Sequence, residues 1–107
     1  MLRIFDVLLQ LLRRLRGPLA ALDRRDPDLA RQCRRALESA ALNIAEGSGS
    51  RGRNRPARYQ DALGSMREAL ACFEVAEALG YLPPLEVELH ASFLHIIRTL
   101  LRLVLPR

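Results

Sequence analysis

Apolar residues recur every three or four positions along most of the chain, in four stretches separated by glycine, proline or aspartate. The first stretch covers about residues 2–24, and Leu8 and Leu15 lie on its apolar stripe. This spacing is typical of a helix that buries one face. Gly17-Pro18 falls inside the stretch. Because proline lacks a backbone N–H and clashes with the preceding turn, we expect a kink or a break there.

Capping signals bound the second helix, which we expect over residues 27–46. Asp26 suits the N-cap and Pro27 the first helical position. Apolar side chains then return at helical spacing as far as Ile44, and Gly47 follows as the expected stop.

A loop rich in glycine, serine and arginine precedes the third helix, which we expect over residues 56–79 and ended by Gly80. After a corner at 81–84, the fourth helix is expected over residues 84–105. The pattern therefore predicts one all-α domain over residues 1–107, an antiparallel up-down four-helix bundle.

The fourth stretch is apolar on more than one face, and a helix of that kind is normally covered on all sides. A terminal helix of a single short chain has only three neighbours, so we expect its outer face to be buried against another subunit. A frayed, apolar C-terminus is the alternative. The residues assigned to the subunit interface are Phe93, Ile97, Leu100, Leu101 and Val104.

Composition agrees with one helical domain: half of the 107 residues are hydrophobic, only 5% are aromatic and tryptophan is absent. Cys33 and Cys72 are too few for a disulfide scaffold, which favours reduced, buried thiols in a cytoplasmic protein. No export signal is apparent, and no apolar run reaches the roughly 20 residues that a membrane span needs, so we expect no membrane contact.

Charge is distributed unevenly along the chain. All 17 basic residues are arginine, which suits phosphate contacts. Codon usage in a GC-rich genome explains the same bias better, so this composition by itself says little about function. Residues 24–58 hold nine arginines and four acidic residues, whereas residues 59–97 hold one arginine and six acidic residues. A protein charged in this way can bind a polyanion, or it can join identical subunits through opposite charges.

No motif for catalysis is apparent. His90 and His95 are five residues apart and do not form an i, i+4 metal pair. The glycine-rich loop lacks the lysine and hydroxyl of a phosphate-binding loop. The sequence therefore predicts a protein that is not an enzyme and holds no metal or cofactor.

Polar residues recur one helical turn apart on the second and third helices: Ser39, Asn43, Glu46, Ser65 and Glu68. If these faces meet, the two carboxylates lie near the bundle interior and need partners, such as Arg34, Arg35 or the amides after Gly47. We interpret the set as a structural polar network that fixes the register of the two helices. A catalytic or metal-binding carboxylate pair is the alternative.

Arginines of the middle of the chain are the candidate nucleic-acid contacts: Arg31, Arg34, Arg35, Arg51, Arg53, Arg55 and Arg58. Flexible segments of arginine and glycine bind phosphate backbones without reading base sequence. The alternative is a solvated connection between helices. Only Tyr59 is close enough in sequence to stack on a base, so we expect binding that is electrostatic and sensitive to salt.

Ordered motifs between Gln32 and Leu82 resemble a known family. They are Gln32 with Arg34 and Arg35, then Ser39, the segment 43–47 (NIAEG), the segment 62–65 (ALGS) with Glu68, and the segment 79–82 (LGYL). Together they resemble the four-helix-bundle family of proteins encoded by intervening sequences in 23S ribosomal RNA genes, which includes the accessory variability proteins of diversity-generating retroelements.

The resemblance implies a homopentameric ring with a central channel, and in the retroelement branch a reverse transcriptase and its template RNA as partners. We therefore expect a non-enzymatic, oligomeric accessory protein that binds RNA or DNA electrostatically. The alternative is a structural or protein-interaction scaffold whose arginines serve subunit contacts.

Overall fold

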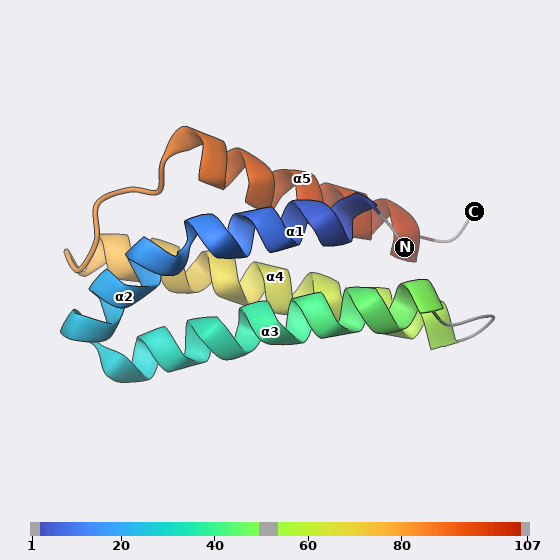
Figure 1. The fold of residues 1–107 in the computed structure, drawn as a ribbon, viewed down its shortest axis with the longest axis horizontal. Helices are drawn as coiled ribbons and strands as arrows, with labels where there is room; N and C mark the ends of the chain where they lie inside the picture. Colours follow the sequence, from blue (N-terminus) through green and yellow to red (C-terminus); the bar gives the residue numbers. More distant parts are fainter. Residues whose placement is uncertain (1–2, 50–53, 106–107) are drawn as a thin grey trace.

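The computed structural model describes residues 3–49 and 54–105, and it confirms the predicted all-α class. The described residues form five helices and no strand (Figure 1). The helices are α1 (Arg3–Arg14), α2 (Arg16–Arg25), α3 (Pro27–Gly49), α4 (Asn54–Ala78) and α5 (Val87–Val104).

The two longest helices, α3 and α4, run antiparallel, and α4 also packs on α5. Helix α1 lies against α5 and α3, and α2 lies against α3 (Figure 1). The molecule is elongated, with dimensions of 43 × 24 × 21 Å. The start of α1, the end of α3, the start of α4 and the end of α5 lie together at one end. The connection between α4 and α5 lies at the other end, which we call the distal end.

The first predicted helix is broken in two at Leu15, so the structure has five helices where the sequence predicted four. Pro18 is the third residue of α2, and a proline ring clashes with the carbonyl four residues earlier, which here belongs to Arg14. The break therefore precedes Gly17-Pro18 instead of falling on it. The Leu15 and Leu19 amides still donate to the carbonyls of Leu11 and Leu15, both at 2.9 Å, so the direction of the chain is nearly kept.

The start of α3 is capped by Asp26, as the sequence predicts. Its carboxylate Oδ1 accepts a hydrogen bond from the Leu29 amide at 3.0 Å, and its carbonyl accepts one from the Ala30 amide at 3.1 Å. Pro27 is the first residue of the helix. An N–H at this position would have no acceptor within the helix, so the lack of one in proline costs no hydrogen bond.

The end of α3 differs from the prediction. The helix continues through Gly47 to Gly49, so the expectation that Gly47 would stop it near residue 46 is wrong. Gly47 is needed for a different reason: a Cβ at this position would lie 2.8 Å from Cδ1 of Tyr59, whose ring is buried between α3 and α4.

Gly80 ends α4 as predicted, with a φ of +77° that suits glycine. The Tyr81 amide donates to the Ala76 carbonyl at 2.8 Å and the Gly80 amide to the Glu77 carbonyl at 2.9 Å, which is a Schellman closure. The following segment remains outside a helix as far as Glu86, and α5 starts at Val87 instead of near residue 84.

The core is aliphatic and fills the space between all the helices. Alanines of α3 and α4 let these two helices approach closely, and Phe73 meets Phe93 edge to face, with ring centroids 6.0 Å apart. No polar or charged residue of the described ranges is buried. None of the helices in these ranges combines the length and apolar character that crossing a membrane requires.

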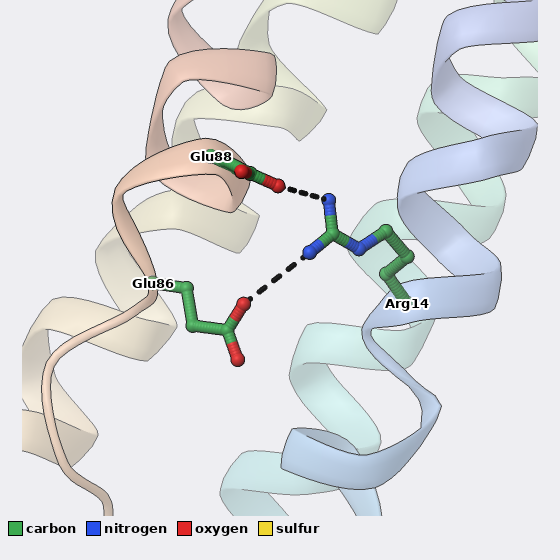
Figure 2. A network of polar contacts seen from close by, with 3 residues as sticks. All are labelled: Arg14, Glu86 and Glu88. Atoms are coloured by element: carbon green, nitrogen blue, oxygen red, sulfur yellow. Dashed lines mark hydrogen bonds and ion pairs between the residues drawn. The ribbon is translucent and has the colours of Figure 1, made fainter.

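Arg14 connects α1 to the start of α5 through two carboxylates (Figure 2). Its Nη1 lies 3.1 Å from Oε2 of Glu88, and its Nη2 lies 3.3 Å from Oε2 of Glu86. The two glutamate side chains are largely exposed and that of Arg14 is about half exposed, so these ion pairs contribute little stability.

Candidate nucleic-acid interface

Three of the candidate arginines lie on the first half of α3. Arg31 is 3.7 Å from Asp28, one turn earlier, and Arg34 is 3.6 Å from Asp23 of α2. Arg35 is exposed and makes no ion pair with another described residue. Of the three, Arg35 is therefore the cation most available to an external anion.

The remaining candidates follow the α3–α4 connection. Arg51 and Arg53 lie outside the described residues. Arg55 and Arg58 lie in the first turns of α4, both exposed, and Arg55 Nε donates to the Gly47 carbonyl at 3.2 Å.

The five described arginines form two groups and not one continuous patch. Gly47, which contacts Arg55, is twelve residues beyond Arg35 on α3, or about 18 Å at 1.5 Å per residue. The groups are therefore separated by roughly half the length of the helix, and a single ligand reaching both must be extended.

Two further basic residues, which were not among the candidates from the sequence, lie at the end of the molecule where α4 starts. Arg3 begins α1 and Arg102 lies in the last turn of α5, both exposed and both at that end (Figure 1). They are far from Arg55 and Arg58 in sequence, and only the antiparallel packing brings the three helix ends together. The available signal was the positive charge at both ends of the chain.

Near Arg31 and Arg35 the surface carries both charges. A shallow hollow between α3 and α4 is lined by Asp28, Arg31, Gln32, Arg35 and Glu68. Gln32 Nε2 donates to Glu68 Oε2 at 3.4 Å. Because two carboxylates accompany the two guanidinium groups, this hollow alone attracts anions weakly.

The structure brings together three of the five residues assigned to the polar network. Asn43 Nδ2 donates to the Ser39 carbonyl at 2.9 Å and to Ser39 Oγ at 3.2 Å, and Ser65 Oγ donates to Ser39 Oγ at 3.0 Å. This half-buried cluster joins α3 to α4 with neutral groups only.

Glu46 and Glu68 are exposed instead of facing the interior, which corrects that expectation. Burial of a carboxylate is costly, and both side chains lie at the surface, where Glu68 accepts the hydrogen bond from Gln32. Of the partners considered for these carboxylates, Arg34 pairs with Asp23 instead.

The outer face of α5 is smaller than predicted. Phe93 and Leu100 are fully buried in the chain's own core and cannot contact another subunit. They face the interior because α1 covers α5 from one side. Ile97 and Val104 are half-buried, whereas Leu101 is 36% exposed.

The two thiols are buried and unbridged, packed between α3 and α4. Burial, reinforced by the neighbouring Cys72, raises the pKa of Cys33 to about 12, and burial also raises the pKa of Cys72. Both therefore stay protonated and unreactive near neutrality. Across the described ranges, no three histidine, cysteine or acidic side chains gather as a metal site.

Residues 20–102 match the family model of the 23S rRNA-intervening sequence protein. No curated protein and no solved structure matches the chain. The match includes α3, α4 and nearly all of α5, together with every motif between Gln32 and Leu82 that carried the resemblance. The chain therefore belongs to the 23S rRNA-intervening sequence protein family.

Proposed function

We propose that this protein is a non-enzymatic, oligomeric accessory factor that binds RNA or DNA through its arginines. The observation that supports this most directly is the exposure of Arg31, Arg35 and Arg58 on a chain of net charge +5. A second support is membership of a family encoded within ribosomal RNA genes.

Binding on these terms is electrostatic. Each guanidinium that contacts a phosphate releases condensed counterions, so affinity falls steeply as salt is added. Tyr59, the nearest aromatic residue to the basic segment, is 2% exposed and cannot stack on a base. The proposed binding therefore has little dependence on base sequence.

In the proposed assembly, subunits contact one another through the apolar residues of α5 that the core does not bury. Leu101 and Leu105 lie one turn apart, with exposed fractions of 36% and 54%, and the half-buried Ile97 and Val104 flank them. With α1 and α2 counted as one broken arm, each subunit is a four-helix bundle in this proposal. The pentameric ring is the arrangement that the family resemblance implies.

Arginine variants test the nucleic-acid proposal. We would measure the fluorescence anisotropy of a labelled RNA oligonucleotide and a labelled DNA duplex from roughly 50 to 200 mM salt. Arg31→Ser/Arg35→Ser and Arg55→Ser/Arg58→Ser should each weaken binding, and each should flatten the slope of log K against log salt on DNA by up to about 2.

The matched control is Arg13→Ser/Arg16→Ser, which removes the same charge from exposed positions of α1 and α2. It should change the slope less than either test variant. Equal effects from all three variants would move the interface away from the assigned arginines. Absence of binding at the lowest salt would contradict the proposal and favour the scaffold alternative.

A further inference from the structure

Two neighbouring grooves lie at the distal end, on either side of the segment that precedes α5. The first separates α2 from this segment, and its walls are mostly apolar: Pro18, Ala21, Leu82, Pro83, Pro84, Leu85 and Leu89. The second lies against α4 and has Leu70 and Phe73 in its lining. Pro84 and Leu85 line both grooves, which therefore form one continuous surface.

Carboxylates surround this apolar surface in excess over cations. Glu74 and Glu77 line the second groove and form no ion pair within the described part of the chain. Glu86 lines the first groove, and it shares Arg14 with Glu88 (Figure 2). The residues that line the two grooves therefore include three carboxylates and one guanidinium, with His90 as their only other titratable member. Glu88 lies just outside the lining, and so does Arg25, whose guanidinium is 5.3 Å from the centroid of the Tyr81 ring. The surface carries an unbalanced negative charge.

An arginine side chain has the two properties that this surface requires. Its guanidinium can pair with Glu74 or Glu77, and its aliphatic stem can lie on apolar groups such as Leu85. An apolar ligand would leave the carboxylates unpaired, and an anion would be repelled. The chemistry of the grooves therefore favours an arginine-containing segment over an apolar ligand or an anion.

The chain itself contains such a segment, residues 51–58, with arginine at four of its eight positions. The segment cannot reach the grooves of its own molecule. Arg58 and Glu74 are sixteen residues apart on the straight helix α4, which corresponds to about 24 Å, and they lie toward opposite ends of the molecule. Only a second copy can bring the two surfaces together.

We propose that the paired grooves of one copy bind the arginine-rich segment 51–58 of a second copy. The two surfaces differ, so the contact is head-to-tail and is separate from the proposed contact through α5. It needs no nucleic acid, and it weakens with salt because its charges are exposed.

The test uses the full-length protein and a fluorescein-labelled peptide with the sequence of residues 48–59, without nucleic acid. Peptide binding is followed by anisotropy at low salt. Glu74→Gln/Glu77→Gln should weaken binding about five- to tenfold, as expected for the loss of two exposed charge pairs. The matched control is Glu38→Gln/Asp61→Asn, which removes two exposed carboxylates elsewhere on α3 and α4 and should change affinity by less than about twofold.

Several outcomes would overturn the proposal: no binding of the peptide, equal weakening by the groove and control variants, or unchanged affinity of a peptide whose four arginines are replaced by glutamine. If hexa-arginine binds and the peptide of residues 48–59 does not, the ligand of the grooves is a different basic protein. The proposal that a second copy binds there would then be wrong. Circular dichroism of the variants verifies that they remain folded. Because no nucleic acid is present, failure here leaves the proposed function untouched, and failure of nucleic-acid binding leaves this result untouched.

Discussion

Tyr59 packs directly against Gly47, where α3 ends and α4 begins. The tyrosine ring occupies the space that a side chain at position 47 would need. Burial raises the pKa of the Tyr59 hydroxyl, which agrees with a ring enclosed by its surroundings.

Replacing Gly47 by alanine should therefore destabilise the protein by about 1–3 kcal/mol, the usual cost of overpacking. Urea denaturation measures the change. The matched control is Gly64→Ala, also within a helix, where an added Cβ meets nothing within 4 Å. The control should be neutral or stabilising by up to about 1 kcal/mol, since alanine favours helix. Equal destabilisation by both variants would contradict the packing role.

The buried thiol of Cys33 should make stability depend on alkaline pH. Its pKa is about 12 in the folded protein against 9.0 for the ordinary thiol. The unfolded chain therefore loses this proton first, and the stabilisation is complete below pH 9 and is lost as the pH rises toward 12.

Urea denaturation at several pH values between 8 and 10 tests this effect, with Cys33→Ala as the comparison. The wild type should be the more stable protein at pH 8, and its advantage should shrink as the pH rises. An advantage that stays constant over this range would show that the thiol does not ionise differently in the two states.

Among the elements, α3 has the clearest local signal for its start. The Asp26 side chain satisfies the Leu29 amide, one of the donors that the first turn leaves open. Asp26→Ala should cost about 1 kcal/mol in the free energy of unfolding, whereas Asp26→Ser should keep most of the stability. Equal losses in the two variants, measured by thermal and urea denaturation, would assign the effect of Asp26 to something other than capping.

Helix boundaries set by local chemistry could be predicted from the sequence, and those set by packing could not. The cap at Asp26 and the glycine closure at Gly80 depend only on adjacent residues. The sequence could not show that Gly47 leaves room for the ring of Tyr59, twelve residues later. Gly47 was therefore interpreted as the residue that ends the helix. A break in the helix caused by Pro18 was expected. The break lies at Leu15 because the proline ring clashes with the carbonyl one turn earlier.

The candidate site shows the same division. Helical spacing was sufficient to group Ser39, Asn43 and Ser65, because all three lie where α3 meets α4. The same spacing predicted that Glu46 and Glu68 lie near the interior, although both are exposed. Periodicity shows which residues share a face of a helix. It does not show how the helix is rotated about its axis, and therefore which residues at the edge of that face are buried.

At the scale of the whole molecule, the apolar character of α5 exceeds what one chain covers, although by less than the sequence suggested. Phe93 and Leu100 are satisfied by the chain's own core, while Leu101, Leu103 and Leu105 remain partly or largely exposed. At the C-terminal end of α5, these three leucines form the apolar surface that we propose for the contact with a second copy.

Light scattering should give a particle mass of at least twice the 12.1 kDa of a single chain. Leu101→Glu/Leu105→Glu should lower this mass, because it places two charges on the proposed interface. Val87→Glu, at an 84% exposed position at the opposite end of α5, should leave it unchanged. A single-copy mass at all concentrations of the wild type would contradict assembly through α5.

The binding of the unaltered protein to a DNA duplex, measured against salt, tests the central claim most directly. If the four candidate arginines that are exposed among the described residues, Arg31, Arg35, Arg55 and Arg58, each contact a phosphate, the slope of log K against log salt should be about −3 to −4. Binding that does not weaken with salt, or no binding even at roughly 50 mM salt, would contradict an electrostatic nucleic-acid-binding role.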